Sequence, residues 1–413
     1  MNDPALPLDL AALTAAHARI RDAVIRTAQW RNDALSEELG GAVEFKLENL
    51  QRTGSFKLRG ATHKIGRLLA GAARPAGVIA ASAGNHAQGV ARAAAQAGLR
   101  AVVVMPATAS LTKIRACREL GAEVRLVGDT LEAAADEARR VADAERLAFL
   151  HPYDDWDVIA GQASCGLEMR EDAPDLTVAV VPLGGGGLLA GVALALKLQN
   201  PTIRVVGVQA EAVAPWRHFL VDGTLDTVPP AAHTIADGIK VKRPGVLTRQ
   251  VIARYVDEIV TVDDNAVAEA IVTLLERTRT IGEGAGVVGL AALMLRKVTL
   301  APHDRAVVVI SGGNVDMSLV GRSIDYGLAS SGRLMCIAVT ISDAPGQLLA
   351  LLRSVAELGM NVRHVEHRRG ELHVAVGMTE VLLQMETRDF EHQRALLAHF
   401  AAEGLTVRNL LAP

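Results

Sequence analysis

The chain is poor in aromatic side chains, which make up 3% of its 413 residues although 50% are hydrophobic. We therefore expect a core of Ala, Val, Leu and Ile. No apolar run of 18 uncharged residues occurs, and such a run would be needed for a helix that spans a membrane. Met1–Leu10 carries two Asp and no basic residue, unlike a secretory signal. The formal net charge is −3, so no positive excess favours nucleic acid.

Cysteine is also scarce. Cys117, Cys165 and Cys336 are widely separated and match neither a disulfide framework nor a zinc-ligand pattern. We expect all three to be buried as small apolar side chains. This usage fits a reducing, cytoplasmic setting.

Short apolar segments alternate with Ala-rich helical segments from about residue 43 to 325, within a chain long enough for two or three domains. The pattern predicts strands at 77–81, 99–105, 123–127, 178–182, 203–209 and 306–310, and helices at 85–97, 110–120 and 130–145. Near-continuous apolar strands suit parallel sheets that are buried on both faces, with helices as crossovers. The fold class is therefore α/β.

The pattern of residue types changes near residue 326. Residues 326–333 are small, polar and turn-prone, which predicts a linker. Beyond it, strands are expected at 334–341, 361–367, 371–376, 381–386 and 405–409, with helices at 347–358 and 391–403 and a turn at 343–346. With one strand more than the six-element pattern, this order indicates a compact ferredoxin-like βαββαβ domain.

Lys57 lies in the segment Gly54–Ala61, which reads Gly-Ser-Phe-Lys-Leu-Arg-Gly-Ala. If Lys57 lies in the first turn of a helix, the positive end of the backbone dipole would disfavour its charged ammonium form and so favour the neutral amine. The neutral amine is the form that attacks carbonyls. A lone lysine would more simply be a solvated helix residue. Three further motifs favour the reactive interpretation.

Each of these motifs follows a predicted strand. Ser82–Gly89 would open a helix with free N–H groups for a carboxylate or phosphate, although Ser82 and Asn85 could also be plain helix caps. Ordering the four glycines from Gly184 to Gly187 costs backbone conformational entropy. Because they have no side chains, their backbone N–H groups can approach an anion closely. A flexible structural turn is the alternative for this loop. Ser311–Asn314 is the third motif, and in open α/β sheets such loops meet at one cleft.

The glycine loop lacks the Gly-Lys-Ser/Thr of a nucleotide-binding P-loop, and Leu189 stands where the third glycine of a dinucleotide fingerprint would be. The loop therefore favours a monophosphate. A lysine amine, an anion cradle and small polar donors around one cleft indicate a site for pyridoxal 5'-phosphate.

On these motifs, in this order and spacing, nearly the whole chain resembles the threonine/serine dehydratases of the fold-type II pyridoxal phosphate family. The resemblance is closest to threonine ammonia-lyases with one C-terminal ACT domain, whose signature Asp343-x-Pro345-Gly346 is present. It implies a two-lobed catalytic region, 1–325, with a large lobe at about 1–48 and 152–325 and a small lobe at about 49–151. A linker at 326–333 and an ACT regulatory domain at 334–413 would follow.

The resemblance also implies roles for individual residues. Lys57 would hold the cofactor covalently and remove the α-proton. Phe56 would pack on the pyridine ring, Asn85 would bond the ring hydroxyl, and Ser311 would face the ring nitrogen. The N–H groups of Gly184, Gly185, Gly186, Gly187 and Leu188 would hold the phosphate. The substrate carboxylate would lie on Ser82, Ala83, Gly84, Asn85 and His86.

Glu283, in Gly282–Gly286, would assist the phosphate in protonating the leaving hydroxyl, unless it is a solvated or helix-capping carboxylate. Ala83 stands where serine racemases of the family have a second serine, which argues for a lyase. Glu211 matches the first acidic ligand of family members with a metal, but Arg217 follows in place of a second carboxylate. We therefore expect no divalent metal, although carbonyl oxygens could still hold a monovalent ion.

The implied activity is deamination of L-threonine to 2-oxobutanoate and ammonia, with L-serine as secondary substrate. A serine or 3-hydroxyaspartate dehydratase is the alternative within the family. One methyl group on the substrate changes the free energy of discrimination in a pocket by only about 1–3 kcal/mol. A non-catalytic amino-acid sensor is the alternative from another class. The implied ACT domain predicts isoleucine or valine as effector and a homodimer or homotetramer, unless this domain serves only in dimerisation.

Overall fold

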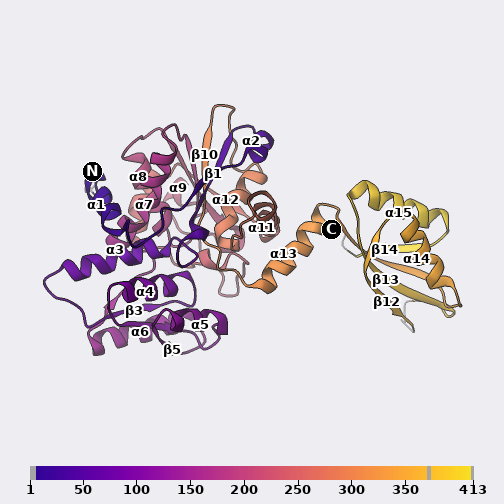
Figure 1. The fold of residues 1–413 in the computed structure, drawn as a ribbon, viewed down its shortest axis with the longest axis horizontal. Coiled ribbons are helices and arrows are strands. Elements are labelled where there is room, and N and C mark those ends of the chain that lie inside the picture. The colour runs from indigo at the N-terminus through magenta and orange to yellow at the C-terminus, as the bar shows by residue number, and fades with distance from the viewer. Residues whose placement is uncertain (1–5, 370–373, 411–413) are drawn as a thin grey trace. The chain divides into compact units, whose positions relative to one another are not determined.

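The structure is a computed structural model and describes residues 6–369 and 374–410. Its contacts divide the chain into two units, Met1–Asp316 and Met317–Pro413. The first unit contains two mainly parallel sheets, and the second contains one antiparallel sheet (Figure 1). Among the described residues, no helix has the combination of length and apolarity that crossing a bilayer requires.

Six strands form the larger sheet of the first unit, in the order β1-β2-β10-β7-β8-β9. Their bounds are Gln29–Arg31 (β1), Ala42–Leu47 (β2), Val178–Pro182 (β7), Arg204–Ala210 (β8), Glu258–Val262 (β9) and Arg305–Ile310 (β10). All pairs are parallel except β1 with β2 at one edge. The predicted strands at 178–182, 203–209 and 306–310 are confirmed, and β7 is buried along its whole length, as a central parallel strand should be.

Four parallel strands form the smaller sheet, in the order β5-β4-β3-β6. They are Val78–Ala81 (β3), Ala101–Met105 (β4), Glu123–Leu126 (β5) and Ala148–Phe149 (β6). The last is too short for an apolar run to reveal it. The other three agree with the predicted strands within two residues at either end.

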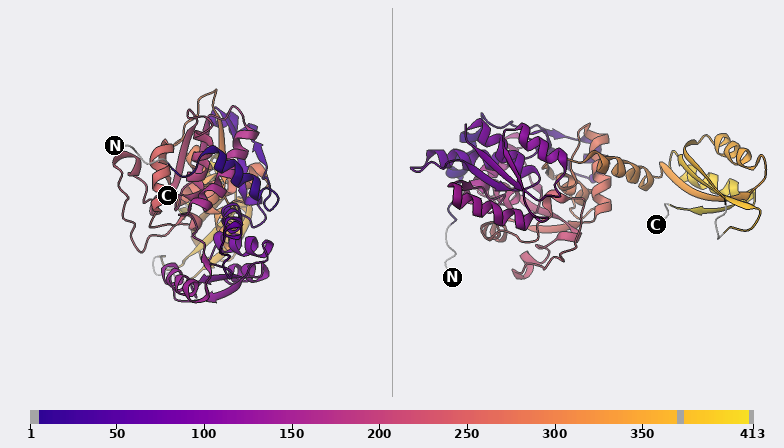
Figure 2. Two further views of the ribbon diagram at one scale, coloured as in Figure 1. Left: turned by 90° about the vertical axis from the view of Figure 1, so that its left-hand side faces the viewer. Right: turned by 90° about the horizontal axis from the view of Figure 1, so that it is seen from below.

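The helices of the first unit lie against these sheets, with α4, α5 and α6 around the smaller one (Figures 1 and 2). Their bounds are Leu10–Ile20 (α1), Asp33–Leu39 (α2), Lys57–Ala70 (α3), Asn85–Gln96 (α4), Leu111–Glu119 (α5), Leu131–Glu145 (α6), Trp156–Asp172 (α7), Gly187–Lys197 (α8), Phe219–Asp222 (α9), Val246–Tyr255 (α10), Asp264–Thr278 (α11) and Gly284–Met294 (α12). Side chains of Thr130, Asp155 and Asp263 accept backbone N–H groups at the starts of α6, α7 and α11.

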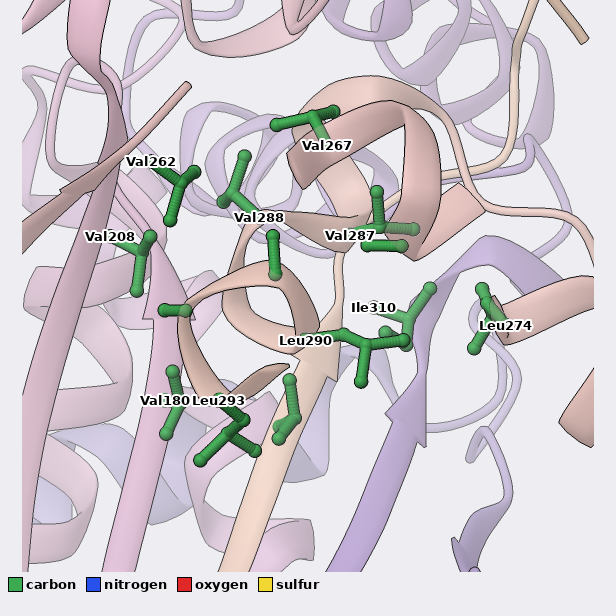
Figure 3. Close-up of a cluster of buried hydrophobic side chains, with 14 of the residues drawn as sticks. Val180, Val208, Val262, Val267, Leu274, Val287, Val288, Leu290, Leu293 and Ile310 are labelled. Atoms are coloured by element: carbon green, nitrogen blue, oxygen red, sulfur yellow. The ribbon is translucent and has the colours of Figure 1, made fainter. Parts of the chain in front are cut away.

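Helix α12 lies at the centre of the main aliphatic core. Its Val287, Val288, Leu290 and Leu293 pack against Val180 of β7, Val208 of β8 and Leu274 of α11, without an aromatic ring among the labelled side chains (Figure 3). Full burial of one such side chain contributes about 1.5–3 kcal/mol. This packing explains how a chain with 3% aromatic residues builds its core.

The second unit begins with α13 (Met317–Ser330) and continues as βαββαβ. Its elements are β11 (Leu334–Ser342), α14 (Gln347–Glu357), β12 (Asn361–Arg368), β13 (Met378–Glu386), α15 (Phe390–Ala402) and β14 (Thr406–Asn409). The sheet order is β12-β13-β11-β14, with antiparallel pairs throughout. Leu351 of α14 and Phe400 of α15 belong to one buried apolar cluster with Ile337 of β11 and Leu383 of β13. The predicted ferredoxin-like order is confirmed.

Three local predictions differ from the structure. The stretch expected as a linker is helical as far as Ser330, because α13 buries Val320, Ser323 and Gly327 along one side. The strand expected at 371–376 is not present at 374–376, which form a bend and the start of a turn, and 371–373 lie outside the described residues. Cys336 is partly exposed, unlike Cys117 and Cys165, because it alternates with the buried Met335 and Ile337 of β11.

Candidate active site

A cavity of about 280 Å³ lies where loops from both sheets of the first unit meet. Parallel strands carry their ligand-binding loops at their carboxyl ends. Segments that follow β3, β7 and β10 accordingly line this cavity, together with the start of α3. The predicted site residues in its wall are Phe56, Lys57, Ser82, Ala83, Gly84, Asn85, His86, Gly184, Gly185, Gly186, Gly187, Leu188, Glu283 and Ser311. The tertiary structure thus brings together all the residues that we predicted.

Lys57 is the first residue of α3, and its Nζ donates a hydrogen bond to the Pro152 carbonyl at 2.8 Å. Burial lowers the pKa of Lys57 to about 8, because the charged ammonium loses its hydration, while the Glu283 charge opposes this shift. Its Nζ also lies 5.1 Å from the centre of the Phe56 ring. A substantial fraction of this amine is therefore neutral near pH 8, with burial as the main cause.

Backbone contacts hold the segment before Lys57 against the loop after β10. Ser55 forms a bridge with Gly312, and the Phe56 N–H donates to the Ser311 carbonyl at 3.1 Å. Gly54 has a φ of 70°, and a Cβ there would lie 2.4 Å from Asn314 Oδ1. Only glycine suits this turn, so the Gly-Ser pair before Lys57 sets where α3 begins.

Asn85, the first residue of α4, bridges two polar side chains. Its Nδ2 donates to Glu283 Oε1 at 2.6 Å, and its Oδ1 accepts from Asn314 Nδ2 at 2.8 Å. Asn314 Nδ2 also donates to the Thr53 carbonyl at 2.8 Å. The loops after β3 and β10 and the start of α12 are therefore joined by one polar chain.

Glu283 is 4% exposed, and its side chain makes no capping hydrogen bond to α12. It is therefore neither the solvated nor the helix-capping carboxylate that we considered. Burial raises its pKa to about 8, and the nearby Asp237 charge adds to this, while the Asn85 hydrogen bond works in the opposite direction. A carboxyl that stays protonated at neutral pH can act as a general acid.

The turn before α4 offers backbone donors rather than capping side chains. Gly84 is the N-cap of α4, and the Ser82 hydroxyl accepts from the Gly84 N–H at 3.1 Å. His86 is buried with Nε2 2.9 Å from the Leu150 carbonyl, and burial, aided by the Lys57 charge, lowers its pKa to about 3. A neutral His86 therefore leaves the first N–H groups of α4 as the main attraction for a carboxylate.

The glycine loop runs from the end of β7 into α8 between close walls. A Cβ on Gly184 would lie 2.9 Å from Ile239 Cα, and one on Gly185 would lie 2.4 Å from the Tyr153 ring. Gly186 has a φ of 97°, in the left-handed region. Trp216 Nε1 donates to the Gly184 carbonyl at 2.8 Å and Thr248 Oγ1 to the Gly185 carbonyl at 2.9 Å.

These contacts occupy carbonyls of the glycine loop, whereas the first N–H groups of a helix such as α8 have no intrahelical acceptor. The positive end of the helix dipole adds to their attraction for an anion. The loop is therefore a rigid, side-chain-free cradle, rather than the flexible turn that we considered as its alternative. Its N–H groups suit a phosphate group, as the monophosphate hypothesis requires.

Several residues of the site carried no sequence signal that we used. Pro152 and Tyr153 follow the short strand β6, and Asn314 was part of a motif without a role of its own. Lys113 of α5 and Asp237 of the 3-10 helix η3 (Asp237–Ile239) form an ion pair in the cavity wall, with Nζ–Oδ2 at 3.0 Å. Isolated charged residues in surface-like segments cannot be assigned to a cavity from their spacing.

Arg59, two residues after Lys57, anchors α3 through a buried ionic cluster. Its guanidinium donates to both carboxyl oxygens of Glu48 at 2.7 and 2.8 Å and to both oxygens of Glu168 at 2.7 and 2.8 Å. Lys46 Nζ also lies 2.7 Å from Glu168 Oε2. These side chains are almost fully buried, so each depends on its partners for the loss of hydration.

Glu211 and Arg217, where the sequence departs from the metal-site pattern, are both exposed. Arg217 Nη2 lies 3.4 Å from Glu211 Oε1. Within residues 6–369 and 374–410, no group of three or more His, Cys, Asp or Glu side chains could hold a metal ion.

Comparison with known proteins agrees with this geometry. Residues 20–312 match the family model described as "Pyridoxal-phosphate dependent enzyme". An L-threonine ammonia-lyase from Thermotoga maritima is 45% identical over 393 residues, which cover 95% of this chain and 97% of that protein.

Two solved structures are similar to about three quarters of this chain. A threonine deaminase from T.th. is 38% identical with a TM-score of 0.70, over 75% of this chain and 99% of that chain. Maize serine racemase is 30% identical with a TM-score of 0.72, over 77% of this chain and 97% of that chain. Both comparisons leave about a quarter of this chain unmatched.

Proposed function

Because the chain belongs to the family of pyridoxal-phosphate dependent enzymes, we propose that it converts L-threonine to 2-oxobutanoate and ammonia, with L-serine as a secondary substrate. The 45% identity to an L-threonine ammonia-lyase over 95% of the chain supports this activity. The observation that carries it is Lys57 at the wall of a cavity that also holds the glycine cradle and a carboxyl whose pKa is raised to about 8.

The residues present fit pyridoxal phosphate. Lys57 would hold its aldehyde carbon, Phe56 would pack on its ring, and the N–H groups from Gly184 to Leu188 would hold its phosphate. Asn85 would bond the ring hydroxyl. When bound, the cofactor would withdraw electrons from the substrate α-carbon. Ser311, 3% exposed at the end of β10, would face the ring nitrogen with a hydroxyl, which does not enforce protonation as a carboxylate would.

The chain's own groups would then handle the substrate and its protons. The N–H groups of the Ser82–His86 turn would bind the substrate carboxylate. Lys57 Nζ would take the proton from the α-carbon, for which the lowered pKa of this amine is suitable. Glu283, aided by the cofactor phosphate, would give a proton to the departing β-hydroxyl. Hydrolysis of the released enamine would yield the 2-oxo acid and ammonia.

Ala83 supports a lyase rather than a racemase. It lines the cavity beside the carboxylate turn, and a methyl group cannot carry a proton. Inversion needs a second proton carrier on the face of the substrate opposite Lys57. We therefore expect the purified protein to form little D-amino acid from an L-substrate, which chiral chromatography can measure.

The second unit supports a regulatory role. Its βαββαβ order is that of an ACT domain, and a hollow of about 280 Å³ lies between the turn at Asp343–Gly346 and β12. Arg369 Nε pairs with Asp343 Oδ1 at 3.1 Å in its wall. We propose an ACT regulatory domain that binds isoleucine or valine, as feedback control in isoleucine biosynthesis. Its edge strands β12 and β14 would allow pairing in a homodimer or homotetramer.

A dimerisation domain without an effector is the alternative for this unit.

The three free thiols support a reducing, cytoplasmic setting.

The deciding experiment is a 2-oxo acid assay of the purified protein with threonine, serine and 3-hydroxyaspartate, each with and without isoleucine or valine. Threonine should be turned over fastest. A protein that takes up no pyridoxal phosphate and releases no 2-oxo acid would instead be the amino-acid sensor.

A further inference from the structure

An ion pair joins two sides of the cavity. Lys113 comes from α5, beside the smaller sheet, and Asp237 comes from η3, which packs against α12. A Cβ on Gly238 would lie 3.3 Å from Glu283 Oε1, so η3 directly adjoins that carboxyl. The ion pair therefore lies on the side of the cavity where the leaving hydroxyl would meet its acid. Any second charged group on the substrate β-carbon would have to enter this region.

Two of the three lysines in the described cavity wall already have an assigned role or an ion-pair partner. Among the described lining residues, the lysines are Lys57, Lys113 and Lys240. Lys57 is assigned to the cofactor and the α-proton, and Lys113 is neutralised by Asp237 at 3.0 Å. Lys240 Nζ lies 3.2 Å from His233 Nδ1. A β-carboxylate would gain no unpaired partner from Lys113 and would approach the carboxylate of Asp237.

We propose that the Lys113–Asp237 ion pair is a specificity determinant that disfavours hydroxy amino acids with a second carboxylate relative to those with a neutral β-substituent. This inference rests on the proposed dehydratase function and distinguishes L-threonine from 3-hydroxyaspartate. Specificity of this kind arises from an unfavourable charge contact with the wrong substrate as much as from contacts with the right one. The effect should be moderate, because the Lys113 and Asp237 side chains are 31% and 59% exposed.

The test compares four proteins: wild type, Asp237→Asn, Lys113→Met and the double variant. For each, kcat/KM is measured with threonine, serine and 3-hydroxyaspartate. Asp237→Asn removes the repelling charge and frees Lys113, so it should raise the ratio of kcat/KM for 3-hydroxyaspartate over threonine by about fivefold. Lys113→Met and the double variant should show no such rise. Both single variants break the ion pair, so a rise confined to Asp237→Asn separates charge recognition from mere opening of the cavity.

Lys240→Met is the matched control, because it removes a lining lysine without altering the ion pair. Its ratio should stay at the wild-type value. An equal rise in both single variants, an unchanged ratio in Asp237→Asn, or a loss of discrimination only in Lys240→Met would overturn the proposal. The wild-type threonine rate reports on the proposed function separately: if it is absent, that function fails, whereas a normal rate with an unchanged ratio refutes only the ion-pair role.

Discussion

Asn85 Nδ2 lies 2.6 Å from Glu283 Oε1, although the two residues are 198 positions apart in the chain. The contact links the first turn of α4 to the start of α12, and it holds a buried carboxyl whose pKa is raised to about 8. This carboxyl is the candidate acid for the leaving hydroxyl.

Replacement Glu283→Gln should lower kcat for threonine by roughly 100-fold to 10,000-fold, the usual contribution of a general acid. Glutamine preserves the shape of the side chain but has no acidic proton. Absorbance of the bound cofactor should remain, since Lys57 is unchanged. Steady-state kinetics check the loss, and a kcat within threefold of wild type would remove Glu283 from the mechanism.

The contribution of Glu283 to the stability of the cofactor-free protein should fall as pH rises from about 4.5 to 8. Glu283 has a folded pKa of about 8 against an ordinary 4.5, so the folded state binds more protons than the unfolded state in that window. The expected slope from this one group is at most about 1.4 kcal/mol per pH unit. Urea unfolding of wild type and Glu283→Gln at several pH values gives the difference, and parallel curves would show that the carboxyl does not titrate there.

Replacement Lys57→Ala should abolish the visible absorbance of bound pyridoxal phosphate together with 2-oxo acid formation. No other described lysine donates to the Pro152 carbonyl in the cavity wall. Lys64→Ala is the control in the same helix, because Lys64 pairs with Asp155 and Asp157 at 2.7 and 3.0 Å outside the site. The control should keep its colour. Colour that persists in Lys57→Ala would place the covalent link elsewhere.

Replacement Gly185→Ala should weaken the affinity for pyridoxal phosphate about tenfold or more and destabilise the fold by about 1–3 kcal/mol. The new Cβ would lie 2.4 Å from the Tyr153 ring, so either the ring or the cradle must move. Fluorescence titration of the cofactor-free protein measures the affinity. Gly321→Ala in α13 is the control, since a Cβ there meets nothing within 4 Å and should leave both quantities nearly unchanged.

Replacement Arg59→Ala should lower the free energy of unfolding by about 3–5 kcal/mol, because it leaves two buried carboxylates without their main partner. Glu48 and Glu168 are 0% and 1% exposed. Arg139→Ala, which breaks an exposed pair with Asp136 at 3.2 Å, should cost at most about 1 kcal/mol. Denaturant unfolding compares the two variants, and equal losses would mean that the buried cluster contributes little.

Much of the fold could be predicted because its signals are local. The buried strands β3, β4, β7, β8 and β10 are near-continuous apolar runs. The glycine loop and the turn at Lys57 can be recognised from their glycines, which lie where a Cβ would clash. The predicted fold class, with its ferredoxin-like C-terminal domain, is confirmed. The short strand β6 and the helical continuation of α13 through Ser330 were missed, because two residues or a polar helix face give no periodic signal.

The sequence by itself indicated many of the residues that line the cavity, since three of the motifs follow strands at whose carboxyl ends backbone N–H groups are available. Only the tertiary structure decided their electrostatics. The low pKa of Lys57 and the high pKa of Glu283 arise mainly from burial, which depends on segments far away in the chain. The Asn85–Glu283 hydrogen bond and the Lys113–Asp237 ion pair likewise join residues 198 and 124 positions apart, and no local pattern encodes such contacts.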